Sequence, residues 1–242
     1  MIFETMGDPG TPKKGLLLHA MAADGSQFRA IGRRLEAEYF LLLPTFDGHH
    51  QEGKTVFTTL DDQVDKILRE LWRRGITELD FIAGTSLGAL AAFELYKRQT
   101  LKVRKYVFDG GPFFLLNQVQ KRFLRWRFWI PLALLKRIPG LARVSAKLYG
   151  TALTAIFVKN MTFLTKLDID RVISAIGDAA IPEPLYDGSA RLVFLYGSRE
   201  DAYRSFERFR GLPGLELLVK DGCRHCQYAM EQGAEYAVML RS

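Results

Sequence analysis

The residues with the clearest capacity for chemistry form a short motif in the first half of the chain. Gly84 to Gly88 reads Gly-Thr-Ser-Leu-Gly, between an apolar run, Phe81 to Ala83, and a helical pattern that begins at Leu87. A serine at the tip of so sharp a turn needs small neighbours, because the strand and the helix approach closely there. The turn points the Ser86 hydroxyl away from the sheet, and the N–H of Leu87 can donate to a developing oxyanion. This arrangement predicts a serine nucleophile for acyl transfer.

A serine hydroxyl is a weak nucleophile at neutral pH, so a base must lie beside it. Four histidines are available, at positions 19, 49, 50 and 225. His225 lies on the loop that follows the last predicted strand. In a doubly wound parallel sheet with the chain order serine, acid, histidine, the base lies on this last loop. We therefore predict that His225 is the base.

The acid that orients this base is expected on the loop after the preceding strand. Glu200 and Asp201 both lie on that loop, and Asp109 at the end of an earlier strand is a third candidate. Exposed loop positions are the commonest place for carboxylates, so the residue pattern leaves all three candidates open.

The elements that must position these groups alternate along the chain. Strands are expected at 15–19, 39–44, 81–83, 105–108, 191–196 and 215–219, with at most one edge strand before them. Helical patterns fall between them, and one of these helices has Thr59 as its N-cap and ends at Gly75. The alternation predicts an α/β fold with a mostly parallel, doubly wound sheet, whose ligands bind at the carboxyl ends of the strands.

The segment 113–189 differs in composition from the predicted core, 1–112 and 190–242. It is rich in Phe and Trp, and no acidic residue occurs from Gly110 to Leu167. The same span carries ten positive side chains, more than the net charge of +7 of the whole chain: Lys121, Arg122, Arg125, Arg127, Lys136, Arg137, Arg143, Lys147, Lys159 and Lys166. We expect a helical cap over the strand ends, broken into short helices at Pro131, Pro139 and Gly140.

Taken together, these motifs resemble those of the α/β-hydrolase superfamily, over nearly the whole chain outside the cap. The resemblance rests on four stretches, His19-Ala20-Met21, Gly84 to Gly88, Gly197-Ser198-Arg199-Glu200 and Gly222-Cys223-Arg224-His225. The chain is most similar to small capped bacterial serine hydrolases whose acid motif reads Gly-Ser-x-Glu. Relatives that open epoxides or displace halides have Asp where this chain has Ser86.

The resemblance implies specific roles for several residues. It favours Glu200 over Asp201 as the acid, and it implies that the N–H of Met21 is the second oxyanion donor beside Leu87. The family usually has His-Gly where this chain has His19-Ala20. Because alanine tolerates positive φ less well than glycine, Ala20 and Ala22 remain alternative donors. Residues predicted to contact the substrate are Ala20, Phe113, Phe114 and Trp126.

The function implied by the resemblance is hydrolysis of carboxylic esters with a partly apolar acyl group, through an acyl-enzyme on Ser86. One alternative is a thioesterase or acyltransferase that uses the basic cap for an anionic acyl carrier. Another is a non-catalytic binding protein with this fold. The basic cap itself is interpreted as a solvated face, as a surface for anionic lipid, or as a site for a negative group of the substrate. Nucleic acid is not expected as a partner, and the oligomeric state stays open.

The composition also predicts what the protein does not need. Neither metal-ligand spacing nor a dinucleotide fingerprint occurs, so no metal or cofactor is expected. Cys223 and Cys226 flank His225 and are expected to be packing residues, with a redox switch as the alternative. No apolar run reaches the ~18 residues of a membrane span, and no leader pattern occurs at the start. A cytoplasmic protein is therefore expected.

Overall fold

The fold was analysed in a computed structural model that describes residues 1–50, 52, 55–138, 151–161, 163–177 and 190–242. Within these residues seven strands form one sheet in the order β1-β3-β2-β4-β5-β6-β7. The strands are β1 (Ile2–Met6), β2 (Lys14–Leu18), β3 (Phe40–Thr45), β4 (Glu78–Thr85), β5 (Lys102–Asp109), β6 (Arg191–Gly197) and β7 (Leu215–Lys220). Strand β1 is antiparallel to β3 and every other pair is parallel. The predicted α/β sheet with one N-terminal edge strand is confirmed.

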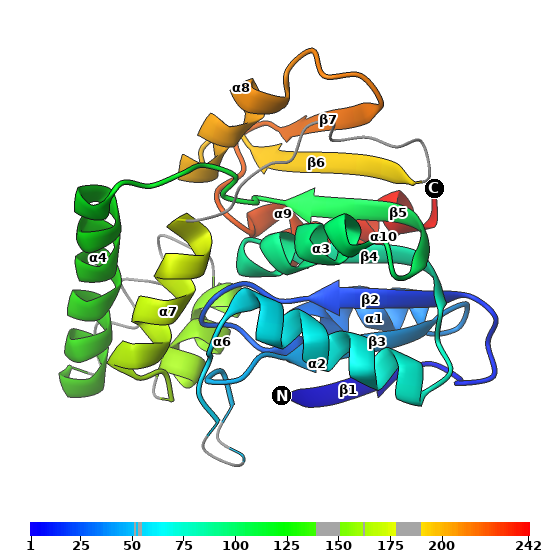
Figure 1. The fold of residues 1–242 in the computed structure, drawn as a ribbon, viewed down its shortest axis with the longest axis horizontal. Helices are drawn as coiled ribbons and strands as arrows, with labels where there is room; N and C mark the ends of the chain where they lie inside the picture. The colour runs from blue at the N-terminus through cyan, green and yellow to red at the C-terminus, as the bar shows by residue number, and fades with distance from the viewer. Residues whose placement is uncertain (51, 53–54, 139–150, 162, 178–189) are drawn as a thin grey trace.

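Helices cover both faces of this sheet (Figure 1). The described helices are η1 (Gly25–Phe28), α1 (Arg29–Leu35), α2 (Leu60–Arg73), α3 (Leu87–Arg98), α4 (Gln118–Arg137), α6 (Thr151–Met161), α7 (Lys166–Gly177), η3 (Asp201–Ser205), α8 (Phe206–Phe209), α9 (Gln227–Glu231) and α10 (Gly233–Arg241). Side chains of β2 alternate between the two layers: Leu16 and Leu18 belong to the core beneath α2 and α3, whereas Leu17 belongs to the core beneath α1 and α10. Burial on both faces explains why these strands read as continuous apolar runs.

The connection from β4 to α3 confirms the strand–turn–helix predicted around Ser86. A Cβ added to Gly84 would overlap the carbonyl of Gly88, and one added to Gly88 would overlap the carbonyl of Leu18 on the neighbouring strand. Both positions therefore require glycine, since the helix crosses the sheet at the shortest distance the backbones permit.

The insertion between β5 and β6 contributes α4, α6 and α7, which gather at the carboxyl ends of the parallel strands, on the left of Figure 1. Helix α4 packs against α7 and α6. The described part of the insertion is helical, as predicted, while its role as a cap and the boundaries 113–189 stay predictions. None of the helices that the structure describes has both the length and the apolar character needed to cross a bilayer.

One expectation about this insertion is wrong. Helix α4 continues through Pro131 to Arg137, so Pro131 does not divide it. Proline removes the hydrogen bond to the carbonyl four residues earlier, which belongs to Arg127. Because Arg127 is exposed, water can satisfy that carbonyl, and the interruption is tolerated. The other two expected breaks, Pro139 and Gly140, lie outside the described residues.

Candidate active site

Ser86 occupies the turn between β4 and α3 in a backbone conformation that few residues other than glycine adopt. Its φ is 53° and its ψ is −111°. Its N–H donates to the carbonyl of Asp109 at the end of β5 (2.8 Å), and its own carbonyl accepts from Ala89 and Leu90 in α3. Such strain costs on the order of 1–3 kcal/mol and persists only where surrounding contacts impose it. The turn therefore fixes Ser86 at the carboxyl edge of the sheet.

His225 follows β7, and its side chain is paired with Glu200 on the loop after β6. The Nδ1 of His225 lies 2.5 Å from Oε2 of Glu200. The other carboxylate oxygen, Oε1, accepts from the N–H of Gly197 (2.7 Å). The Glu200 side chain is only 1 % exposed, so both oxygens are held in a position from which water is largely excluded. With Nδ1 engaged, Nε2 is the nitrogen of His225 that can accept a proton.

The loop Asp109-Gly110 brings Ser86 and the His225–Glu200 pair to the same place. Gly110 has a φ of +60°, and a Cβ there would lie 2.8 Å from Oε2 of Glu200 and 3.0 Å from Nδ1 of His225. The preceding residue, Asp109, accepts the N–H of Ser86. The hydrogen bonds of the described residues do not include one between the Ser86 hydroxyl and His225. Contacts of this kind often tighten only when substrate binds.

The structure separates the three candidate acids. Asp201 is exposed and forms an ion pair with Arg127 on the cap (2.8 Å). Asp109 is buried, and its Oδ2 has no hydrogen-bond partner among the described residues. Burial, together with the nearby charge of Glu200, raises the pKa of Asp109 to about 8, against a smaller opposing effect of His225. Burial therefore favours the protonated form of Asp109, and Glu200 is the carboxylate that contacts the imidazole.

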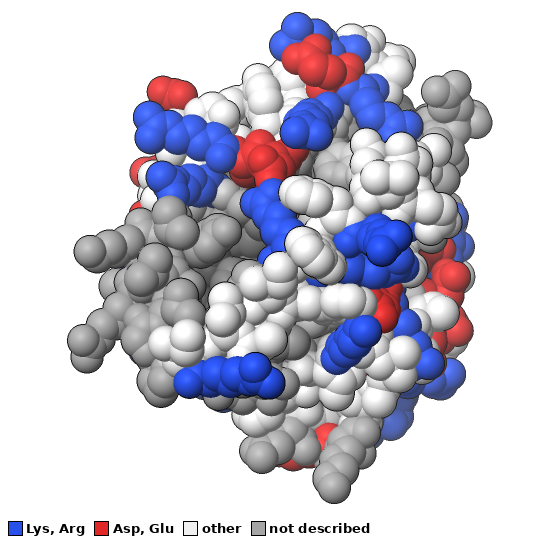
Figure 2. Space-filling view, turned by 90° about the vertical axis from the view of Figure 1, so that its left-hand side faces the viewer, with Lys and Arg blue, Asp and Glu red and all other residues white. Residues whose placement is uncertain are grey.

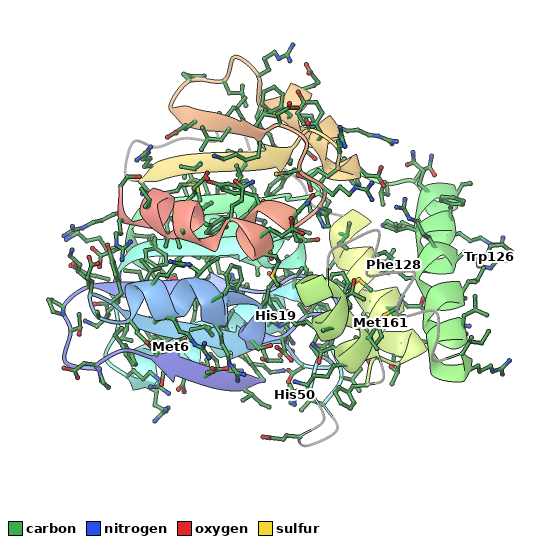
Figure 3. All side chains as sticks on the ribbon, turned by 180° about the vertical axis from the view of Figure 1, so that it is seen from behind. Met6, His19, His50, Trp126, Phe128 and Met161 are labelled. Carbon is green, nitrogen blue, oxygen red and sulfur yellow. The ribbon has the colours of Figure 1, made fainter. Side chains whose placement is uncertain are left out.

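The other histidines are committed to the structure of the strand ends. His19, at the end of β2 (Figure 3), accepts the N–H of Phe46 at Nε2 (3.0 Å) and donates from Nδ1 to the carbonyl of Ala20 (2.7 Å). Burial and the neighbouring His49 lower the pKa of His19 to about 3, so it stays neutral. The Nδ1 of His49 is 3.0 Å from the carbonyl of Asp47, and the ring is buried. Nε2 of His50 lies 3.8 Å from the buried carboxylate of Asp47. His225 differs from the other three because its ring nitrogen lies within hydrogen-bond distance of a buried carboxylate, that of Glu200.

The loop after β2 narrows the choice of the second oxyanion donor. The N–H of Ala20 donates to Oε1 of Gln27 (2.9 Å), so it is not available to a substrate. The positive φ falls at Ala22 (61°) and not at Ala20, which explains why alanine can replace the usual glycine at position 20. For Met21, Ala22 and Leu87, no residue in the described ranges accepts the N–H. Met21 with Leu87 stays the predicted pair, and Ala22 is the remaining alternative.

Asp24 fastens this loop to the cap. Its Oδ2 accepts from Nζ of Lys159 (3.2 Å) and from Nδ2 of Asn160 (3.1 Å), both on α6. Burial alone would raise the pKa of Asp24, but hydrogen bonds from Ser26, Asn160 and Lys159 lower it to about 2. The loop after β2, which is predicted to supply an oxyanion donor, is thus held by contacts with α6 as well as with the sheet.

The cysteines beside the base have the properties of packing residues. Cys223 and Cys226 are free and buried, and burial raises the pKa of both thiols, so neither is a thiolate at neutral pH. Burial lowers the pKa of His225, whereas its contact with the Glu200 carboxylate raises it. The redox switch stays a prediction.

Gln27 is a residue that sequence reasoning missed. Its side chain is buried, and besides holding Ala20 it donates from Nε2 to Oγ1 of Thr85, the residue before Ser86 (2.8 Å). One amide therefore connects the loop after β2 to the turn that carries Ser86. A buried glutamine near the start of a short helix gives no signal in the sequence, because its two partners are distant along the chain.

Replacing Gln27 by leucine should lower kcat about tenfold or more while leaving KM nearly unchanged, since the oxyanion donor shifts but the binding surface does not. Thr85→Val removes the other end of the bridge and should act in the same direction. The double variant should be no slower than Gln27→Leu, because both changes break one connection. Steady-state kinetics on p-nitrophenyl butyrate, corrected for active-site concentration, checks this. A lower melting temperature with unchanged kcat would show a purely structural role.

Two of the residues predicted to contact substrate lie elsewhere. The ring of Phe113 is fully buried in an aromatic cluster with Phe93, Phe194 and Phe209, so it belongs to the core. Trp126 points outward from α4 (Figure 3) and is 61 % exposed. Ala20 lies next to the predicted oxyanion donor, and Phe114 is half-buried after β5. Phe113 is therefore packed in the core and Trp126 is exposed to solvent, a difference that aromatic content alone does not reveal; contact of Ala20 and Phe114 with substrate stays a prediction.

Comparisons with known proteins agree with this architecture. The sequence matches no family model and no curated protein. In solved structures, an α/β-hydrolase family protein from Desulfitobacterium hafniense is 20% identical, with a TM-score of 0.79 over 99% of this chain and 98% of that chain. A carboxylesterase structure from Nitrososphaera gargenis is 18% identical, with a TM-score of 0.76 over 99% of this chain and 92% of that chain. A thermophilic esterase from Thermogutta terrifontis is 15% identical, with a TM-score of 0.77 over 99% of this chain and 91% of that chain. At these identities the similarity shows a shared fold.

Proposed function

We propose that this chain, which has the α/β-hydrolase fold, is a serine hydrolase that cleaves carboxylic esters. One observation carries the proposal: the loop Asp109-Gly110 contacts both the strained turn of Ser86 and the pair formed by His225 and the buried Glu200. This arrangement supports the assignment of Ser86 as the nucleophile, His225 as the base and Glu200 as the group that orients the base.

The proposed reaction begins when Oγ of Ser86 attacks the acyl carbon and its proton moves to Nε2 of His225. The oxyanion that forms accepts from the N–H groups of Leu87 and Met21. His225 then gives the proton to the departing alkoxide, which leaves as the alcohol, and the acyl group stays on Ser86. In the second half a water loses its proton to His225 and attacks the acyl carbon. The acid is released and the proton returns to Ser86.

Glu200 keeps Nδ1 of His225 protonated throughout and stabilises the imidazolium. Its anchoring to Gly197 lets it do so without moving. The assignment to esters is supported by the names of the two similar structures described as esterases or carboxylesterases. A thioester differs only in the leaving atom, so the same groups would serve the alternative thioesterase.

Labelling with a fluorophosphonate probe tests the proposal. The phosphonyl group should attach to one serine, and mass spectrometry of the digested protein should locate it at Ser86. A panel of p-nitrophenyl esters and acyl thioesters of increasing chain length then decides between the two hydrolases. A correctly folded protein that is neither labelled nor active on any member of the panel would be a non-catalytic binding protein.

A further inference from the structure

We propose that the outer face of α4 is a binding surface for a bilayer of anionic lipid. Five apolar side chains at positions i, i+4, i+7, i+11 and i+15 form one stripe along this helix: Val119, Phe123, Trp126, Ile130 and Leu134. All five are exposed, with Val119, Phe123 and Trp126 exposed by 76 %, 68 % and 61 %. In Figure 3 Trp126 points away from the molecule, while Phe128 points toward it.

Contacts on the opposite side of α4 fix this orientation. Leu124, Phe128 and Trp129 pack against the main core. Arg125 lies 3.5 Å from the carboxylate of Asp170 and donates to Ser174 (3.2 Å), both on α7. Helix α4 therefore has two apolar faces. One packs against the core, and the opposite one, which carries the stripe, is exposed to solvent. Exposed stripes of this size usually mark an interaction surface.

The charges around the stripe indicate what covers it. Helix α4 contains no Asp or Glu, and Arg122 and Arg137 are exposed along it. Arg127, on the other flank, reaches Asp201 of the core. Figure 2, which faces this end of the molecule, shows Lys and Arg side chains spread over a largely uncharged surface. A second copy of the chain would bring the same positive charges together, whereas an anionic bilayer complements both the arginines and the apolar stripe.

The residue types suit the boundary of a bilayer. An amphipathic helix with aromatic and aliphatic residues on one face and cations beside them lies in the interface plane, with its apolar face among the head groups and upper acyl chains. Trp and Arg are well suited to this depth, since each combines an apolar body with a polar end. The helix lies at the carboxyl ends of the parallel strands (Figure 1), and Ser86 directly follows one of these ends, that of β4.

Co-sedimentation with vesicles of phosphatidylcholine, with and without phosphatidylglycerol, tests this surface. The protein should bind vesicles that contain phosphatidylglycerol and release them at high salt. Phe123→Ser combined with Trp126→Ser should weaken binding about tenfold or more. Trp72→Ser is the matched control, because Trp72 is also exposed (49 %) but lies on α2, and it should bind as the parent does.

The charge component needs its own variants. Arg122→Gln and Arg137→Gln should each weaken binding about fivefold. Arg104→Gln removes an exposed arginine on β5, which lies 3.4 Å from Asp80, and should have little effect. Ser86→Ala should bind vesicles like the parent, so this result stays separate from whether the protein is a hydrolase.

Several outcomes would overturn the proposal. Equal binding to vesicles with and without phosphatidylglycerol would remove the anionic lipid. Unchanged binding by the Phe123 and Trp126 double variant would remove α4 as the surface. If the parent does not bind vesicles but forms dimers, and the double variant is monomeric, the stripe is an interface with a second copy of the chain.

Discussion

Replacing Ser86 by alanine should reduce kcat for p-nitrophenyl butyrate by about a million-fold while the protein keeps its fold. Without the hydroxyl no acyl-enzyme can form, and the remaining activity comes from the oxyanion donors and from substrate binding alone. The turn should survive, because alanine meets the same backbone strain at φ 53° as serine does. Kinetics with highly purified protein, together with circular dichroism and the melting temperature, measures both parts of the expectation.

The control for this variant is Ser198→Ala, which removes a serine hydroxyl from the acid loop. The Ser198 hydroxyl accepts from the N–H of Gly222 and donates to Asp221. Within the part of the chain that the structure describes, it forms no hydrogen bond with His225 or Glu200. Its kcat should stay within a few-fold of the parent value. If Ser86→Ala retained most of the activity, another nucleophile would be at work and the proposed mechanism would be wrong.

Replacing Glu200 by glutamine should reduce kcat about ten-thousand-fold with little change in KM. The amide has nearly the same shape, so the contact with His225 can persist. However, an amide carries no negative charge. It therefore neither keeps the proton on Nδ1 of His225 as the carboxylate does nor stabilises the imidazolium. The loss therefore appears in the chemical step, which stopped-flow measurement of acylation would follow directly.

The two other carboxylates provide the comparison that identifies the acid. Asp201→Asn removes an exposed ion pair with Arg127 and should cost little, as surface pairs usually do. Asp109→Asn should also stay close to the parent at neutral pH, because a protonated carboxyl and an amide are similar neutral groups. A large loss in Asp109→Asn with a small loss in Glu200→Gln would reverse the assignment of the acid.

Asp109 adds a pH dependence to that comparison. Its pKa is raised in the folded protein from an ordinary 3.8 to about 8. Its contribution to stability is therefore greatest below pH 3.8 and is lost as the pH rises toward 8, because the unfolded chain ionises first. Asparagine does not ionise, so the gap in melting temperature between Asp109→Asn and the parent should move in favour of the variant as the pH rises from 5 to 9.

The parts of the fold that local patterns encode could be predicted from the sequence. The strand–turn–helix at Ser86 follows from two glycines and the periodicity around them, and the N-cap of α2 follows from Thr59, whose hydroxyl accepts the N–H of Asp62. Chain order along a parallel sheet predicts that the loop carrying His225 meets the loop after the preceding strand, but only the resemblance to α/β-hydrolases favoured Glu200 over Asp201 on that loop. In each of these cases the information lies within a few residues or in the order of the strands.

Other features depend on contacts between distant segments. The bridge by Gln27 joins two loops that are far apart along the chain, so no local pattern contains it. Helix α4 has aromatic residues on both sides, and periodicity alone could not tell that Phe128 faces the core while Trp126 faces solvent. The protonation of Asp109 likewise follows from burial beside Glu200, which only the folded arrangement creates.

The position of the insertion between β5 and β6 also bears on how the chain reaches its native state. These neighbouring strands pair in register, from Lys105 with Arg191 to Asp109 with Leu195, although the whole insertion separates them in sequence. The entropic cost of closing a loop grows only slowly with its length, so the long insertion adds little to that cost. However, pairing between strands that are remote in sequence slows folding. Because Ser86 lies on one side of that junction and the His225–Glu200 pair on the other, recovery of turnover after dilution from denaturant would report the late joining of the two halves rather than the earlier formation of helices.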